Sequence, residues 1–132
     1  MRLTRSVGYA IGILLRVNSQ RTNGPVTAAE IADGCEFPPR FLYRVLRRLV
    51  DAGLITGVSG PGGGYALARP AREISLLSIV NAIDGPIAGS ALEPVHRKQR
   101  KALDSVNALC ARCADGFAKD LGRVNLAKLA ES

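Results

Sequence analysis

The residue types best suited to reactive chemistry are three cysteines and one histidine. Cys110 and Cys113 form a C-x-x-C pair, whose spacing suits a thiol redox couple or half of a metal site. A zinc or iron–sulfur site needs four ligands, which His96 or the two thiols of a second copy would complete. Alternatively, both thiols pack as small apolar side chains. These three interpretations stay open. A single histidine with no evident partner gives catalysis no basis, so we expect no enzyme.

Arginines form the second group of candidate functional side chains. Residues 1–72 contain ten Arg, no Lys and four acidic residues, a net charge of 10 − 4 = +6. Residues 73–132 carry only 8 − 7 = +1. Arginine makes planar, bidentate contacts to phosphate and guanine, and a positive surface binds DNA by releasing counterions. The first half of the chain is therefore the candidate binding half, and its favoured partner is nucleic acid.

Length and composition limit the classes of protein. A chain of 132 residues that is 47% hydrophobic can bury a core without a disulfide framework, which excludes a small secreted scaffold. The longest apolar run, residues 10–15, is far shorter than the roughly 18 residues that span a bilayer. The first residues lack the pattern of a signal peptide. We therefore expect a cytoplasmic protein with reduced thiols and no membrane association.

Three helices are predicted in the basic half. Apolar residues from Val7 to Leu15 recur at helical spacing, and Thr27 with Glu30 forms a capping box that opens a second, short helix. A third helix is predicted over about 39–52, with a buried stripe of Leu42, Val45, Leu46 and Leu49. Its outward residues are Arg40, Tyr43, Arg44, Arg47 and Arg48. Two short helices of this kind form a helix-turn-helix whose second helix enters the major groove of DNA.

A glycine-rich segment follows the third helix. Two short apolar runs flank residues 60–64, which predicts a β-hairpin over about 55–68. A phosphate-binding P-loop would need Lys and Ser or Thr directly after the glycines, but Tyr65 and a strand follow them. The hairpin is better interpreted as a wing that lies over the minor groove of DNA.

The C-terminal third is predicted to hold a short and a long helix. The short helix opens after Ser75 and ends at Gly85. In the long helix, apolar residues repeat in nearly heptad spacing: Leu103, Val106, Cys110, Cys113, Phe117, Leu121 and Val124. A second copy of the chain is the simplest partner for such a seam, which predicts a two-fold symmetric homodimer.

Several motifs occur in an order that resembles the Rrf2 family of transcriptional regulators. They are Met1-Arg2-Leu3-Thr4, Glu30-Ile31-Ala32, Phe41-Leu42, Ala52-Gly53-Leu54-Ile55, residues 60–67, Ile74-Ser75-Leu76 and Ile83-Asp84-Gly85. The resemblance implies a homodimeric winged helix-turn-helix protein, more often a repressor, that binds palindromic promoter DNA. It also implies that Arg40 and Phe41 touch bases and that residues 59–64 form the wing. The DNA-contacting residues expected from the pattern and the resemblance together are Arg2, Thr4, Thr27, Pro39, Arg40, Phe41, Tyr43, Arg44, Arg47, Arg48, Ser59, Gly60, Gly62, Gly63 and Tyr65.

Two positions depart from the family pattern. Many members carry Arg before the wing glycines, where this chain has Ser59, and cluster-binding members place three cysteines in the loop before the long helix, where this chain has none. The ligands of an iron–sulfur cluster therefore cannot be carried over from the resemblance: no cofactor is expected, and a cluster on other residues stays open as the alternative.

The predicted fold is mainly α with a small β wing: a winged helix-turn-helix domain in residues 1–86, then a loop and long dimerisation helix in 87–132. The predicted function is a homodimeric, sequence-specific transcriptional regulator, with its recognition helix over about 39–52 and its wing over about 55–68. Two alternatives remain. One is a thiol- or metal-based redox protein that uses Cys110 and Cys113 without DNA, and the other is a winged-helix interaction module. Binding of duplex DNA separates the first interpretation from both alternatives.

Overall fold

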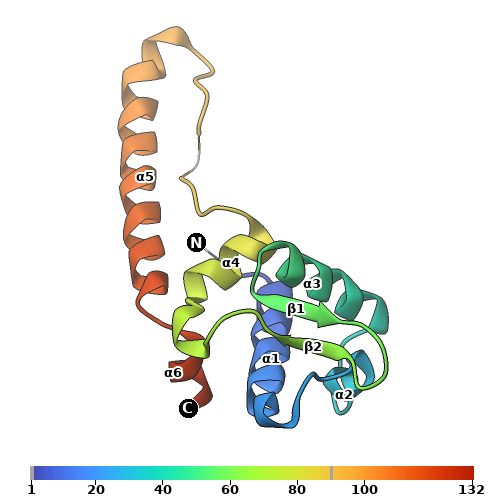
Figure 1. Cartoon of the computed structure of the whole chain (residues 1–132). Helices are drawn as coiled ribbons and strands as arrows, with labels where there is room; N and C mark the ends of the chain where they lie inside the picture. Colours follow the sequence, from blue (N-terminus) through green and yellow to red (C-terminus); the bar gives the residue numbers. More distant parts are fainter. Residues whose placement is uncertain (1, 90) are drawn as a thin grey trace.

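A computed structural model of the chain describes residues 2–89 and 91–132, and it is mainly helical with one small sheet (Figure 1). In chain order the helices and strands are α1 (Arg5–Ser19), α2 (Ala28–Ala32), α3 (Pro39–Asp51), β1 (Ile55–Val58), β2 (Gly64–Leu67), α4 (Leu76–Asp84), α5 (Arg100–Gly122) and α6 (Leu126–Ala130). The short 3-10 turns are η1 (Arg21–Asn23), η2 (Ala71–Glu73) and η3 (Arg97–Gln99). The predicted fold class is confirmed. No helix in the described ranges is long and apolar enough to cross a membrane.

Helix α1 lies at the centre of the core. Its apolar side contacts α3 and α4. The buried residues of α1 include Val7, Ala10, Ile13, Leu14 and Val17. The facing stripe of α3 consists of Leu42, Val45, Leu46 and Leu49, none more than 3% exposed. Because these apolar residues recur at three- and four-residue steps, each helix buries one side and leaves the opposite side free. The predicted stripe of α3 is confirmed.

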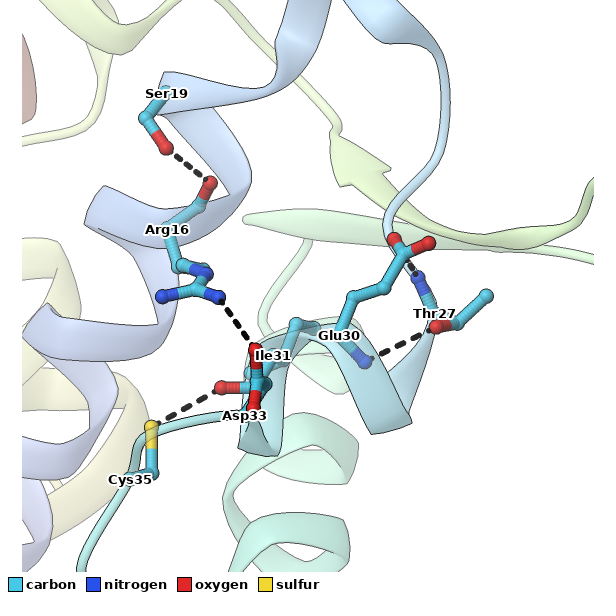
Figure 2. Close-up of polar contacts among 7 residues, drawn as sticks. All are labelled: Arg16, Ser19, Thr27, Glu30, Ile31, Asp33 and Cys35. Carbon is cyan, nitrogen blue, oxygen red and sulfur yellow. Dashed lines mark hydrogen bonds and ion pairs between the residues drawn. The ribbon is translucent and has the colours of Figure 1, made fainter.

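Helix α2 begins with the predicted capping box. The Thr27 hydroxyl accepts a hydrogen bond from the Glu30 backbone N–H at 3.1 Å, and the Glu30 carboxylate accepts one from the Thr27 N–H at 3.2 Å (Figure 2). This pair satisfies two amides that the first turn of a helix leaves without partners. The cap fixes where α2 starts, and the following turn places α3 at an angle to it.

The turn between α2 and α3 is held from both sides. The thiol of Cys35 is exposed and donates to the carbonyl oxygen of Ile31 at 3.0 Å, while Asp33 lies 3.9 Å from the Arg16 guanidinium of α1 (Figure 2). Pro39 opens α3, where a missing N–H costs nothing. The start of α3 is therefore set by a proline and the turn rather than by a side-chain cap.

The C-terminal third differs from the sequence prediction. The long helix ends at Gly122, and a short turn leads into α6, which the sequence patterns did not predict. The Val124 carbonyl accepts from the Leu76 N–H at 2.8 Å, and the Leu126 N–H donates to the Ile74 carbonyl at 2.8 Å. Leu126 is fully buried in the core beside α1. The chain turns here because an apolar side chain four residues beyond the helix, that of Leu126, is buried in the core.

The segment between α4 and α5 runs back along α5. The Asn107 side chain accepts from the Leu92 N–H at 2.8 Å and donates to the Leu92 carbonyl at 3.1 Å. A Cβ added at Gly89 would lie 2.7 Å from the Ala111 backbone nitrogen, so the segment approaches α5 closely there. One side of α5 is thereby covered by its own chain, and in Figure 1 the rest of this helix projects away from α1 and α3.

Candidate DNA-binding surface

The outward side of α3 carries the largest group of arginines. At 100° per residue, Arg40, Tyr43, Arg44 and Arg47 fall on one side, opposite the buried stripe. We call these four residues the α3 arginine face. All four are exposed, and 60% of Tyr43 is accessible although it is a large side chain. In the described residues the only ion pair that involves this face joins Arg47 and Asp51 at 3.9 Å, and both side chains are highly exposed. An exposed ion pair of this kind contributes little free energy, and it involves only one of the three arginines. The α3 arginine face therefore keeps a net positive charge.

The ring of Phe41 lies beside two arginines of the α3 arginine face, Arg40 and Arg44. The guanidinium carbons of Arg40 and Arg44 lie 5.4 Å and 5.8 Å from the centre of its half-buried ring. Cations at this distance interact favourably with an aromatic face. Phe41 therefore limits the freedom of two arginines whose charged ends remain available to a ligand.

Arg48, which was predicted to contact DNA, makes a hydrogen bond within the chain. It lies about 80° around α3 from Arg40, and its Nη1 donates to the Ile83 carbonyl oxygen near the end of α4 at 2.7 Å. That carbonyl is one of those that the end of a helix leaves without a partner. Arg48 thus ties α3 to α4, and this contact with a residue 35 positions away, rather than its helical angle, distinguishes it from the α3 arginine face.

The hairpin turn forms the second predicted contact region. Ser59 and Gly60 are exposed, and Gly60 and Gly62 have φ of 86° and 75°, which favour glycine. Tyr65 lies at the other end of the turn, where its N–H and carbonyl both pair with Val26 at 2.8 Å. Its half-buried side chain packs on the core, so Tyr65 anchors the hairpin rather than extending from it.

Two other predicted contact residues are engaged within the chain. Thr27 caps α2, as described above. The Thr4 hydroxyl accepts from the Val7 N–H at 3.4 Å and donates to the Asp84 carboxylate at 2.7 Å, which joins the start of α1 to the end of α4. A third predicted residue, Arg2, is exposed and lines a small cleft with Asp84 and Phe117. None of these three residues belongs to the α3 arginine face.

The glycines of the hairpin turn give a testable prediction. A Cβ at Gly63 would collide with the carbonyl oxygen of Val58, whereas a Cβ at Gly57 would have no atom within 4 Å. Gly63→Ala is expected to lower the free energy of unfolding by about 1–3 kcal/mol because the turn must open. The matched control Gly57→Ala should change it by less than about 0.5 kcal/mol. Urea denaturation followed by circular dichroism measures both, and equal midpoints for the two variants would show that the turn is not closed in this way.

The predicted cysteine and histidine site is not assembled within one chain. Cys110 is half-buried and Cys113 exposed, one turn apart on α5. The imidazole Nδ1 of His96 accepts from the Lys98 N–H at 3.2 Å before α5 begins, roughly 15 Å along the helix from Cys110. Across residues 2–89 and 91–132, no three His, Cys, Asp or Glu side chains lie close enough to hold a metal ion. The donors of one chain therefore do not fit a metal ion or an iron–sulfur cluster.

The predicted apolar seam of α5 is partly used within the chain. Phe117 packs against the core and Leu121 is buried in it, while Leu103 and Cys110 are half-buried. The residues left open are Val106 (41% exposed), Leu109 (51% exposed) and Cys113, which share one side of the helix. We call them the α5 stripe. Leu109 was absent from the predicted seam because only the close approach of Gly89 and Leu92 to α5 decides which side of this helix remains open.

Comparisons with known proteins agree on one family. The profile of the Rrf2 family, described as an iron-dependent transcriptional regulator, matches residues 3–132. The transcriptional regulator IscR of Serratia proteamaculans is 37% identical over 84 residues, which are 64% of this chain and 51% of IscR. IscR of Xenorhabdus nematophila is 29% identical over 132 residues, covering 100% of this chain and 80% of that protein. In the first of these matches the chain spans about half the length of its relative.

Solved structures show the same fold. The global cysteine regulator CymR of B. subtilis has a TM-score of 0.78 at 21% identity, with 99% of this chain and 97% of CymR covered. The oxidized form of Staphylococcus aureus CymR has a TM-score of 0.72 at 26% identity, with 100% and 98% covered. The similarity therefore extends over the hairpin, α5 and α6 as well as the first three helices.

Proposed function

Because the chain belongs to the Rrf2 family of transcriptional regulators, we propose that it is a homodimeric, sequence-specific DNA-binding protein that acts as a repressor in the cytoplasm. In this proposal residues 1–86 read DNA and residues 87–132 form the dimer. Helix α3 enters the major groove, and the β1–β2 hairpin lies over the minor groove.

The observation that carries this proposal is the α3 arginine face. Three arginines on one exposed side of a helix repel each other, which costs a few tenths of a kcal/mol per neighbouring pair. The core gains nothing from them because they point away from α1. A polyanion that neutralises all three at once accounts for their presence, and an α-helix fits the width of the DNA major groove.

Contacts within the groove are assigned by position. Arg40 and Phe41 lie in the first turn of α3, which contacts base edges in helix-turn-helix proteins, and Arg40 has the fork geometry to bind guanine. Arg44 and Arg47 lie one and two turns further along and are assigned to base edges and phosphates. The exposed turn around Ser59 is assigned to the backbone beside the minor groove, where its glycines allow close approach.

Dimerisation is assigned to the α5 stripe. Among the described residues, helix α5 packs mainly on α4, η3 and parts of the segment before it, residues 87–89 and 91–95, and a helix without tertiary packing is marginal in water. Val106 and Leu109 would gain burial from a second copy of the same helix. A two-fold axis through this stripe would bring two α3 helices to the same side of a DNA duplex.

Cys110 and Cys113 are given no role in DNA binding. The pair supplies two thiols where a metal site needs more ligands, no third donor lies close to them within residues 2–89 and 91–132, and Cys113 belongs to the α5 stripe. No observation within one chain favours the thiol- or metal-based alternative over the DNA-binding function.

Binding of duplex DNA is expected to weaken steeply as salt rises. Each phosphate neutralised by Arg releases counterions, so log K falls with log salt with a slope of about −0.9 per contact. With at least three arginines per protomer, a slope of about −5 is expected for the dimer. Fluorescence anisotropy of a labelled duplex between 50 and 200 mM salt measures it. An affinity that stays flat over this range would contradict the proposed function.

A further inference from the structure

Two arginines of the α3 arginine face share one aromatic ring. The guanidinium carbons of Arg40 and Arg44 lie 5.4 Å and 5.8 Å from the centre of the Phe41 ring, and both distances are within the range of a cation–π contact. The ring itself is held in the first turn of α3, where the Phe41 N–H donates to the Pro38 carbonyl at 3.0 Å. The two guanidinium groups are therefore restrained beside the same fixed point.

Neither of these two arginines has an anionic partner in the described part of the chain. None of the ion pairs within residues 2–89 and 91–132 involves Arg40 or Arg44, and the first turn of α3 contains no acidic residue. Arg47, the third arginine of this face, differs because it pairs with Asp51. The exposed N–H groups of Arg40 and Arg44 therefore remain free to bind an external acceptor.

A restrained orientation matters more for a base than for a phosphate. A phosphate accepts hydrogen bonds from several directions, so that even the point charge of a lysine binds it well. A guanine offers two acceptors in the major groove, N7 and O6, and an arginine must meet both with two parallel N–H groups. Contact with the Phe41 ring orders the two side chains before DNA binds, which lowers the entropy lost on binding. This arrangement favours guanine as the acceptor.

The spacing of the two arginines fits neighbouring base pairs. Residues four positions apart on an α-helix are separated by about 6 Å along its axis. Successive base pairs of a duplex are separated by about 3.4 Å. Arg40 and Arg44 lie in the first two turns of α3, the part of a recognition helix that reaches base edges. Two arginines placed in this way reach guanines that are one or two base pairs apart.

We propose that Arg40 and Arg44 each bind one guanine, so that each half-site of the DNA carries two G·C pairs no more than two base pairs apart. Phe41 is the positioning residue for both arginines. This assignment rests on the proposed function, because it requires α3 to lie in the major groove.

Selection from random duplexes with three proteins tests which positions are read. The wild type is expected to fix a G·C pair at two positions of each half-site. Arg44→Lys keeps the charge but loses the planar fork, so one of these positions should relax while the other stays fixed. Arg72→Lys makes the same exchange at an exposed position on η2 and is the matched control, which should relax neither position.

Two base analogues test which atoms of the guanine are bound. In the selected duplex, 7-deazaguanine at either position removes N7, and the affinity of the wild type should fall about 5- to 150-fold. Inosine keeps N7 and O6 and lacks only the amino group in the minor groove, so it should cost less than about threefold. The Arg44→Lys protein should respond to 7-deazaguanine at one of the two positions only.

Variants of Phe41 test its positioning role. Phe41→Leu removes the aromatic face, and affinity for the selected duplex should fall about tenfold because both arginines lose their restraint. Affinity for a duplex of A·T pairs alone should stay within about twofold, since phosphate contacts do not need this restraint. Phe41→Tyr keeps the ring and should restore wild-type affinity for the selected duplex. Equal losses on both duplexes would show that Phe41 has only a structural role.

The remaining outcomes separate this inference from the proposed function. If the selected half-sites fix no G·C pair, or if 7-deazaguanine costs no more than inosine, the two arginines bind phosphates. The inference then fails, while a DNA-binding function with a steep salt dependence stands. If no duplex is enriched and binding does not depend on salt, the proposed function fails and this inference fails with it.

Discussion

The double variant Val106→Asp, Leu109→Asp is expected to be monomeric and to lose most of its affinity for DNA. In the proposed dimer the two substitutions would bury four carboxylates without partners, at a cost of about 2 kcal/mol or more each. A monomer presents one α3 helix, so the gain from binding two linked half-sites disappears, and the affinity should fall about 10²–10⁴-fold. Analytical ultracentrifugation measures the assembly, and anisotropy measures the affinity.

Ala108→Asp is the matched control for this experiment. It adds a carboxylate to the same helix at an exposed position on the other side, about 160° from Val106. This control should remain a dimer with wild-type affinity. A dimer of the double variant that persists at micromolar concentration would show that the interface lies away from the α5 stripe.

The double variant Arg40→Ala, Arg44→Ala is expected to abolish specific binding while leaving the dimer intact. Each arginine is assigned about 1–3 kcal/mol of binding free energy, and a dimer carries two copies of both. The affinity for a specific site should therefore fall at least about 10³-fold. Stability should change little because both side chains are exposed and lie over the half-buried Phe41 ring, which is not part of the core cluster.

Removal of the same charge elsewhere provides the control. Arg97→Ala with Arg100→Ala also lowers the net charge by two, but these exposed residues lie at the start of α5. This control should lose less than about tenfold, through the weaker long-range field alone. Equal losses in both double variants would mean that net charge, and not the α3 arginine face, determines binding.

The sequence predicts the first part of this fold well because its signals are local. The capping box of Thr27 and Glu30 and the stripe from Leu42 to Leu49 each depend on residues within one or two turns of a helix. Gly53, at φ 73°, lies just past the end of α3, as its position in the sequence indicates. Local hydrogen bonds and periodic burial suffice to define such elements, whatever the rest of the chain does.

The parts that the sequence did not predict depend on contacts between distant residues. Arg48 binds a carbonyl 35 positions away, and α6 forms because Leu126 reaches the core beside α1. The open side of α5 is decided by Leu92 and its neighbours, which cover the opposite side.

Selection of duplexes from a random DNA library tests the central claim most directly. If two α3 helices of one dimer read a single duplex, their centres lie about 34–36 Å apart and the half-sites are related by a two-fold axis. Sequencing of the bound fraction is therefore expected to recover a palindrome with half-sites one helical turn, about 10–10.5 base pairs, apart or a multiple of it. Bound duplexes without shared symmetry, or no enrichment above a sample without protein, would contradict the account.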